Sequence, residues 1–441
     1  MFILKFGGTS VGKPERLRKV GDIVLRTPGK KVVVLSALSG TTNTLVKIGD
    51  YLLGGHLAEA GNEIVKLEQR YKEYAGALFT STEFQAIGME IVGRYFIEIR
   101  RLAEGRFDDR AYRELLAQGE LASTEFFFNH LRERQVGCRL LPALEFMSID
   151  ESQEPELEEI NKKLTAFLSS AEQPEIYITQ GYICRNHRNE IDNLKRGGSD
   201  YTASLIGAAL RAKEVQIWTD IDGMQNNDPR VVKNTLPIAE LTFDEASELA
   251  YFGAKILHPS TIVPAQKRGV PVRLKNTMDE TAPGTLISNQ GTSRQVKAVA
   301  AKDGIIAINI KSSRMLLAYG FLRQVFEVFE RHRTPIDMIS TSEVAVSLTI
   351  DDDRHLNSIV SDLQVFGVIT VDHDQSIICV VGNKLAERQG VLNEVFRSLA
   401  DVPVRMVSFG GSLNNISILV DKRHKEQSLR LLNKGLFKLE G

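Results

Sequence analysis

The sequence predicts an α/β protein in which a layered sheet with helices on both faces is followed by two smaller repeated modules. Strand-like apolar runs alternate with longer helical stretches before about residue 295. Polar, glycine-containing turns follow several of these runs, and beyond residue 295 one pattern of elements occurs twice. A length of 441 residues allows about three domains. We expect them at residues 1–295, 296–375 and 376–441.

The first element is a short strand that leads directly into a glycine-rich turn. The apolar run Phe2–Leu4 is followed by Lys5 and Phe6, and then by Gly7-Gly8-Thr9-Ser10. Paired glycines let backbone amides approach an anion, and a lysine at a strand end can reach a terminal phosphate. The spacing is neither that of the GxxxxGK[ST] loop nor that of the GxGxxG fingerprint. The turn indicates a nucleoside triphosphate site, although a tight turn without a ligand uses the same residues.

The elements that follow continue the alternation of strands and helices. The stretch from Leu57 to Leu131 is largely helical by its apolar pattern. The polar region Glu280–Arg294 contains Pro283 and Gly284 and indicates a linker or an edge hairpin. The further strands are expected at Val32–Leu35, Ile176–Thr179, Val215–Trp218 and Val270–Leu274.

A second turn of the phosphate-binding type stands in the middle of the chain. The segment Arg196-Gly197-Gly198-Ser199-Asp200-Tyr201-Thr202 directly precedes the apolar helical stretch Ala203–Leu210. Ser199 or Asp200 could cap that helix, and the free amides at its start would face an anion. A capped helix without any ligand is the structural alternative.

Two more polar clusters follow later in the chain. Thr219 and Asp220 come directly after a predicted strand, where open α/β sheets place ligands, and Asp228-Pro229-Arg230 follows a few residues on. Phe252-Gly253-Ala254-Lys255 forms the other cluster. A solvated turn and a surface lysine are the alternatives here, but four such clusters in one chain favour a binding site.

The region beyond residue 295 contains an internal repeat. Gly320-Phe321-Leu322 is matched 70 residues later by Gly390-Val391-Leu392, and Ser347–Ile350 is matched at the same offset by Ser417–Val420. Each repeat is predicted to form a strand, a glycine turn, an amphipathic helix and two further strands.

Composition argues against several classes of function. The chain has 55 Lys and Arg against 56 Asp and Glu, so no overall basic charge favours nucleic acid, and any anion site is local. No apolar run approaches the length of a membrane span or of a signal-peptide core. Cys138, Cys184 and Cys379 lack metal-ligand spacing and are expected to be reduced. We expect a cytoplasmic protein that binds neither membranes nor nucleic acid, and we assign no residue as a metal ligand.

Together, the four clusters resemble the amino-acid kinase superfamily and, within it, the aspartokinases. Lys5–Val11 is similar to the family's opening signature, and Arg196–Thr202, Trp218–Asp220 and Phe252–Lys255 recur in the family's order. The resemblance implies a three-layer αβα kinase domain of the amino-acid kinase fold, with a helical insertion bordering the substrate side. It also implies that two ferredoxin-like βαββαβ ACT domains follow.

The same resemblance implies an activity and its cofactors. A monofunctional aspartokinase transfers the γ-phosphoryl group of ATP, with Mg²⁺, to the side-chain carboxylate of L-aspartate and gives 4-phospho-L-aspartate. This is the first step of lysine, threonine and methionine biosynthesis. Because an aspartate side chain has an ordinary pKa of about 3.9, the substrate needs no general base at neutral pH. The site must instead relieve repulsion between two anions with cations, amides and magnesium.

These requirements assign roles to the residues of the four clusters. Lys5 is expected to contact the transferring phosphoryl group, and Asp200 to orient Lys5 or to hold magnesium through water. By resemblance, Lys255 also reaches the nucleotide phosphates, while Thr219, Asp220 and Arg230 lie along the nucleotide. Lys5, Asp200 and Lys255 are thus the expected catalytic residues. The expected ATP-binding residues are Lys5, Gly7, Gly8, Ser10, Thr219, Asp220, Arg230 and Lys255.

Recognition of aspartate requires a cation for the α-carboxylate and an anion for the α-ammonium group. Arg196 offers a bidentate guanidinium for the first, and Glu120 offers a carboxylate for the second. Ser36 and Thr42 match family positions near the substrate, although turn chemistry also explains both residues.

The first repeat resembles that of the lysine-sensitive aspartokinases. This implies inhibition by lysine, with threonine or no effector as open alternatives. Asp337 could pair with the ammonium group of an effector. Sites shared between subunits would require a homodimer or a dimer of dimers formed through the ACT domains. The matching effector positions are Met315, Gly320, Phe321, Leu322, Asp337, Thr341 and Ser342.

Other functions stay open on the sequence alone. An amino-acid sensor whose kinase domain no longer turns over would keep the repeats, but retention of the charged residues of the site argues against such decay. A kinase acting on glutamate or another acyl acid would keep the same fold, while the opening signature together with the repeats favours aspartate. A pair of βαβ modules that only dimerises is the alternative for the repeats.

Overall fold

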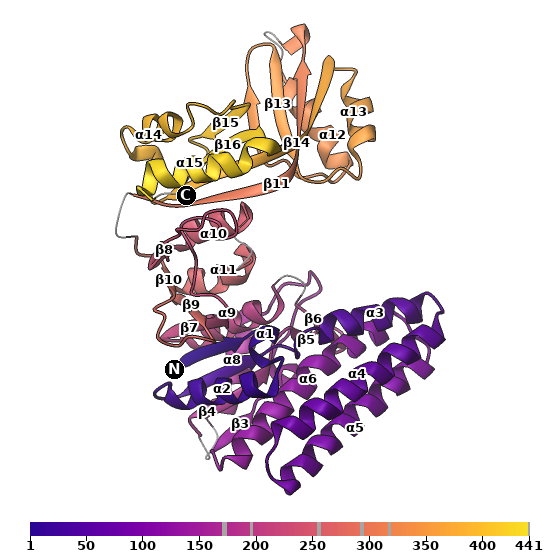
Figure 1. Ribbon diagram of the computed structural model, residues 1–441. Helices are drawn as coiled ribbons and strands as arrows, with labels where there is room; N and C mark the ends of the chain where they lie inside the picture. Colours follow the sequence, from indigo (N-terminus) through magenta and orange to yellow (C-terminus); the bar gives the residue numbers. More distant parts are fainter. Residues whose placement is uncertain (170–173, 195–196, 254–256, 292–294, 316–318, 440–441) are drawn as a thin grey trace. The chain divides into compact units, whose positions relative to one another are not determined.

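The computed structural model describes residues 1–169, 174–194, 197–253, 257–291, 295–315 and 319–439 (Figure 1). Contacts divide the chain into two compact units. The first unit comprises Met1–Met224, Ala239–Phe243 and Leu257–Asn289. The second comprises Gln225–Ile238, Asp244–Ile256 and Gln290–Gly441. Two segments that precede residue 295 therefore belong to the second unit, and the domain limits at 295 and 375 stay predictions.

The first unit is built on an eight-stranded sheet with the order β3-β4-β2-β1-β7-β9-β10-β8 (Figure 1). Neighbouring strands are parallel except β9 and β10, which form an antiparallel hairpin. The predicted strands are confirmed, and the polar region after Glu280 supplies β10, which lies between β9 and β8 and is not an edge. The strands are β1 (Phe2–Phe6), β2 (Lys31–Leu35), β3 (Cys138–Leu140), β4 (Ile176–Gln180), β7 (Glu214–Thr219), β8 (Glu240–Thr242), β9 (Val272–Asn276) and β10 (Thr285–Ser288).

The central strands are buried along nearly their whole length. Every residue of β2 is buried, and Ile3, Leu4 and Phe6 of β1 are 0% exposed. Continuous burial of this kind requires cover on both faces of the sheet, which is typical of parallel strands. Because β4, β2, β1 and β7 run parallel, their carboxyl ends meet at one edge of the sheet, where ligands of open α/β sheets bind.

Three long helices confirm the helical stretch predicted between residues 57 and 131. They are α4 (Leu57–Leu78), α5 (Thr82–Glu104) and α6 (Asp109–Glu133), and they lie side by side (Figure 1). Their apolar faces bury aromatic rings, and the side chains of Ser81 and Asp108 cap α5 and α6 by accepting hydrogen bonds from backbone amides. Glu120 lies midway along α6, among its buried residues.

Shorter elements complete the first unit. Helix α9 is buried over Thr202–Ala209, which agrees with its small and apolar residues on all sides. No helix in the described part of the chain is both long enough and apolar enough to cross a bilayer. The shorter elements are α1 (Gly8–Val11), α2 (Pro14–Arg26), α3 (Thr41–Leu53), α7 (Ala143–Phe146), α8 (Leu157–Leu168), β5 (Ile183–Arg185), β6 (Ile191–Asn193), α9 (Gly198–Leu210) and α11 (Pro259–Arg268).

The second unit contains a six-stranded antiparallel sheet with the order β12-β13-β11-β14-β16-β15. Helix α10 (Phe243–Tyr251) belongs to this unit from Asp244 on. The other elements are β11 (Val296–Lys311), η1 (Ser313–Met315), α12 (Phe321–Arg331), β12 (Ile339–Thr341), β13 (Ala345–Ile350), α13 (Leu356–Leu363), β14 (Val368–Gly382), η2 (Leu385–Glu387), α14 (Val391–Ser398), β15 (Met406–Phe409), β16 (Asn415–Asp421), η3 (Lys422–His424) and α15 (Lys425–Phe437).

The internal repeat is confirmed by equivalent elements in the two halves of this sheet. Gly320 precedes α12 with φ 80°, and Gly390 precedes α14 with φ 78°. Both angles lie in the left-handed region that favours glycine. Strands β13 and β16 follow at matching positions, as do helices α13 and α15. The glycine turns were therefore correctly predicted as the starts of the amphipathic helices.

The two halves are not consecutive along the chain, because they share two long strands. Residues 305–311 of β11 pair with 368–375 of β14 in the first half, whereas 296–302 pair with 377–382 in the second half. The register shifts between Lys302 and Ile305, where the halves meet. The first half is a complete βαββαβ unit. The second has βαββα order, and its remaining strand comes from Val296–Lys302, ahead of the first half.

Candidate active site

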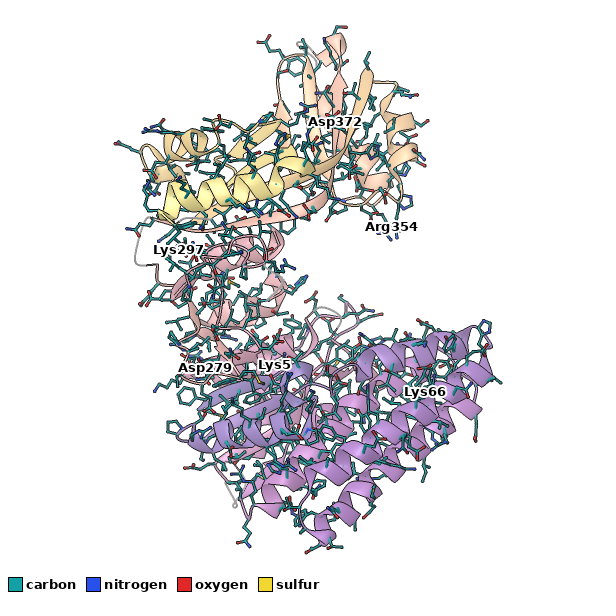
Figure 2. The ribbon with its side chains drawn as sticks, in the orientation of Figure 1. Lys5, Lys66, Asp279, Lys297, Arg354 and Asp372 are labelled. Atoms are coloured by element: carbon teal, nitrogen blue, oxygen red, sulfur yellow. The ribbon has the colours of Figure 1, made fainter. Side chains whose placement is uncertain are left out.

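The ammonium group of Lys5 is the charged centre of the site in the first unit (Figure 2). Lys5 lies on β1, and its side chain is 11% exposed. Its Nζ lies 2.8 Å from Oδ1 of Asp200, in the first turn of α9. An ammonium group this deeply buried requires a charged partner, and Asp200 supplies it. The structure thus brings together the two glycine motifs that the sequence singled out.

The glycines beside Lys5 provide space rather than unusual backbone angles. Gly7 has φ −76° and ψ 169°, which other residues also adopt. A Cβ atom on Gly7 would lie 3.3 Å from Nζ of Lys5, and one on Gly8 would lie 3.1 Å from the carbonyl oxygen of Ala37. Gly8 begins the single-turn helix α1, so the expected turn is partly helical. The glycines let the loop after β2 approach the end of β1.

The hydroxyl group of Ser10 is engaged inside the protein. Its Oγ lies 2.7 Å from Oγ1 of Thr277, the residue after β9, and Ser10 is 1% exposed. The amide of Thr277 in turn donates to the carbonyl oxygen of Thr219 at 2.7 Å. Ser10 therefore fixes α1 to the carboxyl ends of β7 and β9. Sequence reasoning missed Thr277, because no glycine motif or charge marks it.

Ser36 connects the second glycine motif with helix α6. Its Oγ donates to Oγ of Ser199 at 2.8 Å, and its carbonyl oxygen accepts from Oγ of Ser123 at 2.8 Å. Neither Ser199 nor Asp200 caps α9, because Gly197 holds the cap position and both side chains point to other partners. That expectation was wrong, since the helix begins at Gly198, before either residue could cap it.

Glu120 is a buried carboxyl group that has no cationic partner among the described residues. It is 3% exposed, and Oε1 accepts a hydrogen bond from the amide of Ala37 at 3.3 Å. Its Oε2 has no hydrogen-bond partner among the described residues. Burial raises the pKa of Glu120 to about 8, only partly offset by the backbone hydrogen bonds. This carboxyl group is placed to accept hydrogen bonds from a ligand.

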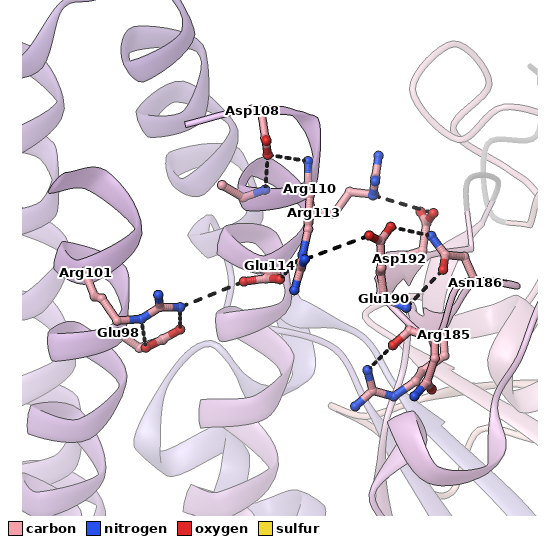
Figure 3. A network of polar contacts seen from close by, with 12 residues as sticks. Glu98, Arg101, Asp108, Arg110, Arg113, Glu114, Arg185, Asn186, Glu190 and Asp192 are labelled. Atoms are coloured by element: carbon pink, nitrogen blue, oxygen red, sulfur yellow. Dashed lines mark hydrogen bonds and ion pairs between the residues drawn. The ribbon is translucent and has the colours of Figure 1, made fainter. Parts of the chain in front are cut away.

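A polar network holds α6 against the hairpin that leads into the second glycine motif (Figure 3). Arg110 pairs with Glu114 at 2.9 Å on α6 and reaches Glu190 at 3.9 Å. Arg113 approaches Asp192 of β6 at 3.5 Å. This network therefore fixes the β5–β6 hairpin against α6, the helix that carries Glu120.

The remaining predicted residues of the first unit border the same edge of the sheet or its neighbouring helix. Thr219 ends β7, and its hydroxyl donates to Oδ1 of the exposed Asp220 at 3.2 Å. Thr42 is the second residue of α3 and is half-buried. No carboxylate, histidine or cysteine cluster of three or more in the described residues could hold a metal ion.

The predicted residue Arg230 is not part of the first unit. It lies in the second unit, where its guanidinium pairs with Asp228 at 2.7 Å. Arg196 and Lys255, which were also predicted, lie outside the described residues. Gly197, with φ 72°, has no room for a side chain, because its Cβ would lie 1.8 Å from Cγ2 of Thr261 on α11. The start of α11 therefore packs on the turn before Asp200.

The predicted effector positions all lie in the second unit. Phe321 is buried in the core of the first half, and Met315 and Leu322 pack against the same core. Gly320 caps α12, while Thr341 and Ser342 are exposed at the end of β12.

Asp337 is the charged residue of this set, and its side chain is 2% exposed. Oδ1 accepts from Nζ of Lys302 at 2.9 Å and from the hydroxyl of Tyr251 at 2.6 Å. Oδ2 has no hydrogen-bond partner among the described residues. Sequence reasoning missed Lys302 and Tyr251, because a lysine in a strand and a tyrosine at a helix end carry no motif of their own.

Comparisons with known proteins agree with this architecture. The family profile described as "Amino acid kinase family" matches residues 1–276, and an "ACT domain" profile matches residues 378–436. Among curated proteins, the chain is 34% identical to lysine-sensitive aspartokinase 3 of Escherichia coli, and the alignment covers 99% of both chains.

Solved structures of E. coli aspartokinase III are similar over the same length. The complex of that enzyme with aspartate and ADP, called the R-state, has a TM-score of 0.82 and 33% identity and covers 99% of this chain and 100% of that chain. The complex with lysine and aspartate, called the T-state, has a TM-score of 0.81 and 33% identity and covers 99% of each chain.

Proposed function

We propose that this chain, which belongs to the aspartokinases of the amino acid kinase family, transfers the γ-phosphoryl group of ATP to the side-chain carboxylate of L-aspartate. The observation that carries the proposal is the buried Lys5–Asp200 ion pair at the carboxyl end of the parallel sheet. A fixed cation at this place neutralises charge on the transferring phosphoryl group, which is the main requirement when one anion attacks another.

The nucleotide is proposed to lie along the edge formed by β1, β7 and β9. Amides of Gly7 and Gly8 support its phosphates, Ser10 holds α1 in place, and Thr219 and Asp220 border the nucleotide at the end of β7. In the related E. coli structure the bound nucleotide is ADP. Arg230 and Lys255 are assigned to the nucleotide by family resemblance alone.

Magnesium is proposed to arrive with the nucleotide. Mg²⁺ is usually held by phosphate oxygens, water and one or two carboxylates rather than by a cage of protein ligands. The described residues fit this mode, because they offer Asp200 beside Lys5 and contain no cluster of three or more metal ligands. Asp200 would hold the ion through water, and the ion would neutralise phosphate charge.

Glu120 is proposed to receive the α-ammonium group of aspartate. Its buried Oε2 has no partner within the described chain, and an incoming ammonium group would satisfy it with a charge-assisted hydrogen bond. Arg196 is proposed for the α-carboxylate, and Ser36 and Thr42 for the edge of the same pocket. A kinase that binds aspartate through these groups places the side-chain carboxylate toward Lys5.

Lysine is proposed as the inhibitor, bound to the first half of the second unit. Asp337 keeps Oδ2 free of hydrogen bonds within the described chain, so an effector ammonium group has an acceptor there. The related E. coli enzyme is named lysine-sensitive and has been solved with lysine. The chain is also proposed to form a homodimer or a dimer of dimers through the ACT domains. Its proposed location is the cytoplasm.

The experiment that tests the activity traps the acyl phosphate product with hydroxylamine. The purified chain is given ATP and Mg²⁺ with either aspartate or glutamate, and lysine or threonine is then titrated. Hydroxamate formed with aspartate and suppressed by lysine is expected. Equal turnover of glutamate would show a broader acyl kinase. No turnover with either acid, despite nucleotide binding, would favour a sensor without catalysis.

A further inference from the structure

One face of helix α10 is attached to the six-stranded sheet of the second unit by three polar side chains. Glu245, Glu248 and Tyr251 are spaced by three residues and therefore share a face of the helix. Glu245, which is 0% exposed, pairs through Oε2 with Nζ of Lys297 on β11 at 3.2 Å. Glu248 accepts a hydrogen bond from the side-chain amide of Asn415 on β16.

The third contact joins the end of α10 to the predicted effector carboxylate. The hydroxyl of Tyr251 donates to Oδ1 of Asp337 at 2.6 Å. Lys302 holds the same oxygen at 2.9 Å, binds Oδ2 of Asp351 at 2.8 Å and lies 4.3 Å from the centre of the Tyr251 ring. Two acidic groups, one ammonium group and one phenol thus form a single cluster around the buried Asp337.

The chain beyond Tyr251 remains in contact with the same sheet. Gly253 has φ 123°, and a Cβ atom there would lie 2.2 Å from the carbonyl oxygen of Ala301, the residue before Lys302. The glycine of the Phe252-Gly253-Ala254-Lys255 signature is therefore required by close packing against β11. The sequence motif by itself indicates only phosphate binding.

After this contact, the next helix in the sequence is α11, which belongs to the first unit and packs on the second glycine motif. Five residues separate Gly253 from Pro259, where α11 begins, and Lys255 lies between them in the sequence. Within the first unit, Thr261 of α11 packs directly on Gly197, three residues before the Asp200 that holds Lys5. The helix that packs on this turn thus begins in the sequence only eight residues after α10 ends.

We propose that Tyr251 is a positioning residue that transmits the state of Asp337 to the nucleotide site. This inference rests on the proposed function, because it concerns the ATP site and the effector site of the same enzyme. The Asp337 carboxylate accepts a hydrogen bond from the Tyr251 hydroxyl. An ammonium group that binds to this carboxylate either competes for the same oxygen atom or rotates the carboxylate away from Tyr251. The end of α10 is then released, and nucleotide affinity falls. By linkage, nucleotide and effector must weaken each other's binding by the same factor.

The test compares the full chain with Tyr251→Phe, which removes only the hydroxyl group. ADP affinity is measured by calorimetry with and without lysine, and KM values are measured separately for ATP and aspartate. The variant should bind ADP about three- to tenfold more weakly and raise KM for ATP by a similar factor, with KM for aspartate unchanged. Lysine should weaken ADP binding in the wild type and have little further effect in the variant.

A matched control is available in the first unit. The hydroxyl of Tyr95 donates to Oε1 of Glu125 at 2.6 Å, so Tyr95→Phe removes the same type of bond away from α10. It should leave ADP affinity and the lysine effect unchanged. Asp337→Asn should weaken ADP binding as Tyr251→Phe does, and the double variant should be no weaker than either single variant, since both changes break one contact.

The outcomes separate this inference from the proposed function. Wild-type ADP affinity together with an unchanged lysine effect in Tyr251→Phe would overturn the inference while leaving the kinase assignment intact. Loss of ADP affinity in both Tyr251→Phe and Tyr95→Phe would also overturn it, because the effect would then be general. If the wild type fails to phosphorylate aspartate but Tyr251→Phe still weakens ADP binding, the proposed function fails and the positioning role stands.

Discussion

Two buried carboxyl groups in this chain each have one bonded and one unbonded oxygen. In Glu120, Oε1 accepts from the amide of Ala37, and in Asp337, Oδ1 accepts from Tyr251 and Lys302. The second oxygen of each has no hydrogen-bond partner in the described part of the chain. An unsatisfied buried acceptor is costly, so each site favours a ligand that donates hydrogen bonds. The two carboxyl groups differ in their surroundings, because the ammonium group of Lys302 lies beside Asp337.

Replacing Lys5 tests the charged centre of the kinase site. Lys5→Ala removes the cation next to the proposed phosphoryl group, and the loss of one such transition-state contact costs about 3–4 kcal/mol, or about 10²–10³ in kcat. Steady-state kinetics with aspartate and ATP measures this loss. Lys66→Ala, at a side chain that is 72% exposed, serves as the control and should retain wild-type kcat. Near-normal turnover of Lys5→Ala would contradict the assigned role.

The pKa of Glu120 predicts how aspartate binding depends on pH. Burial raises this pKa to about 8, so the free carboxyl group is mostly neutral at pH 7. Binding of an ammonium group requires the ionised form. We therefore expect kcat/KM for aspartate to rise with pH from about 6 and to level off near the pKa of about 8.

Glu120→Gln provides the control for this dependence. The variant should raise KM for aspartate and lose the rise of kcat/KM with pH. Because the pKa of Glu120 in the folded chain lies above its ordinary value of 4.5, stability is lost as pH rises toward about 8 and the buried carboxyl group ionises. Glu120→Gln should therefore unfold at a higher temperature than the wild type at pH 8. A pH profile that is flat in the wild type would contradict the proposed role.

At the scale of single elements, the starts of the repeated helices depend on backbone conformation. Gly390 has φ 78°, and apart from its neighbours in the chain no atom lies within 4 Å of the position that a Cβ would take, so the only penalty of Gly390→Ala is the strain of a side chain at a left-handed backbone angle. The expected cost is about 1–2 kcal/mol. Denaturant unfolding followed by circular dichroism measures it through the shift of the transition midpoint.

For a glycine inside a helix, substitution by alanine is expected to raise the stability of the protein rather than to lower it. Gly61 lies within α4, has equally open space around its Cβ position and no positive φ, so Gly61→Ala should stabilise the protein by about 0.5–1 kcal/mol. Destabilisation by both substitutions to a similar extent would show that the left-handed angle is not the cause of the effect at Gly390.

The sequence predicts an element well when the pattern that identifies it involves only residues that are close together in the chain. Apolar period and glycine turns are local, so β1, β2, β4, β7 and β9 of the kinase sheet, the long helices and both repeats were predicted correctly, whereas the short strands β3 and β8 were not predicted. The Lys5–Asp200 pair and the Asp337 cluster join residues that are distant in sequence. The chemistry of phosphoryl transfer suggested the pair as one of two roles for Asp200, whereas only family resemblance pointed to Asp337. Thr277, Lys302 and Tyr251 have ordinary local patterns, which explains why they were missed.

For the whole molecule, the shared strands predict which fragments can fold. A fragment of residues 376–439 lacks Val296–Lys302, so one edge of its part of β14 has no partner. It should not show a cooperative unfolding transition. A second fragment, in which residues 296–302 are attached after residue 439 through a short linker, should unfold cooperatively. Circular dichroism during heating measures this transition. Cooperative folding of the shorter fragment would contradict this interpretation of the sheet.

The shared strands also determine the order in which the sheet can form during synthesis. Residues 296–302 leave the ribosome before the first half is made, and their partners at 377–382 follow about seventy-five residues later. Since domains generally fold as units while the chain grows, the first half can close early, but this strand must wait with unpaired edges. The nascent chain is therefore most open to mispairing while the first half is folding, and a chaperone that covers a short apolar strand would protect it in that interval.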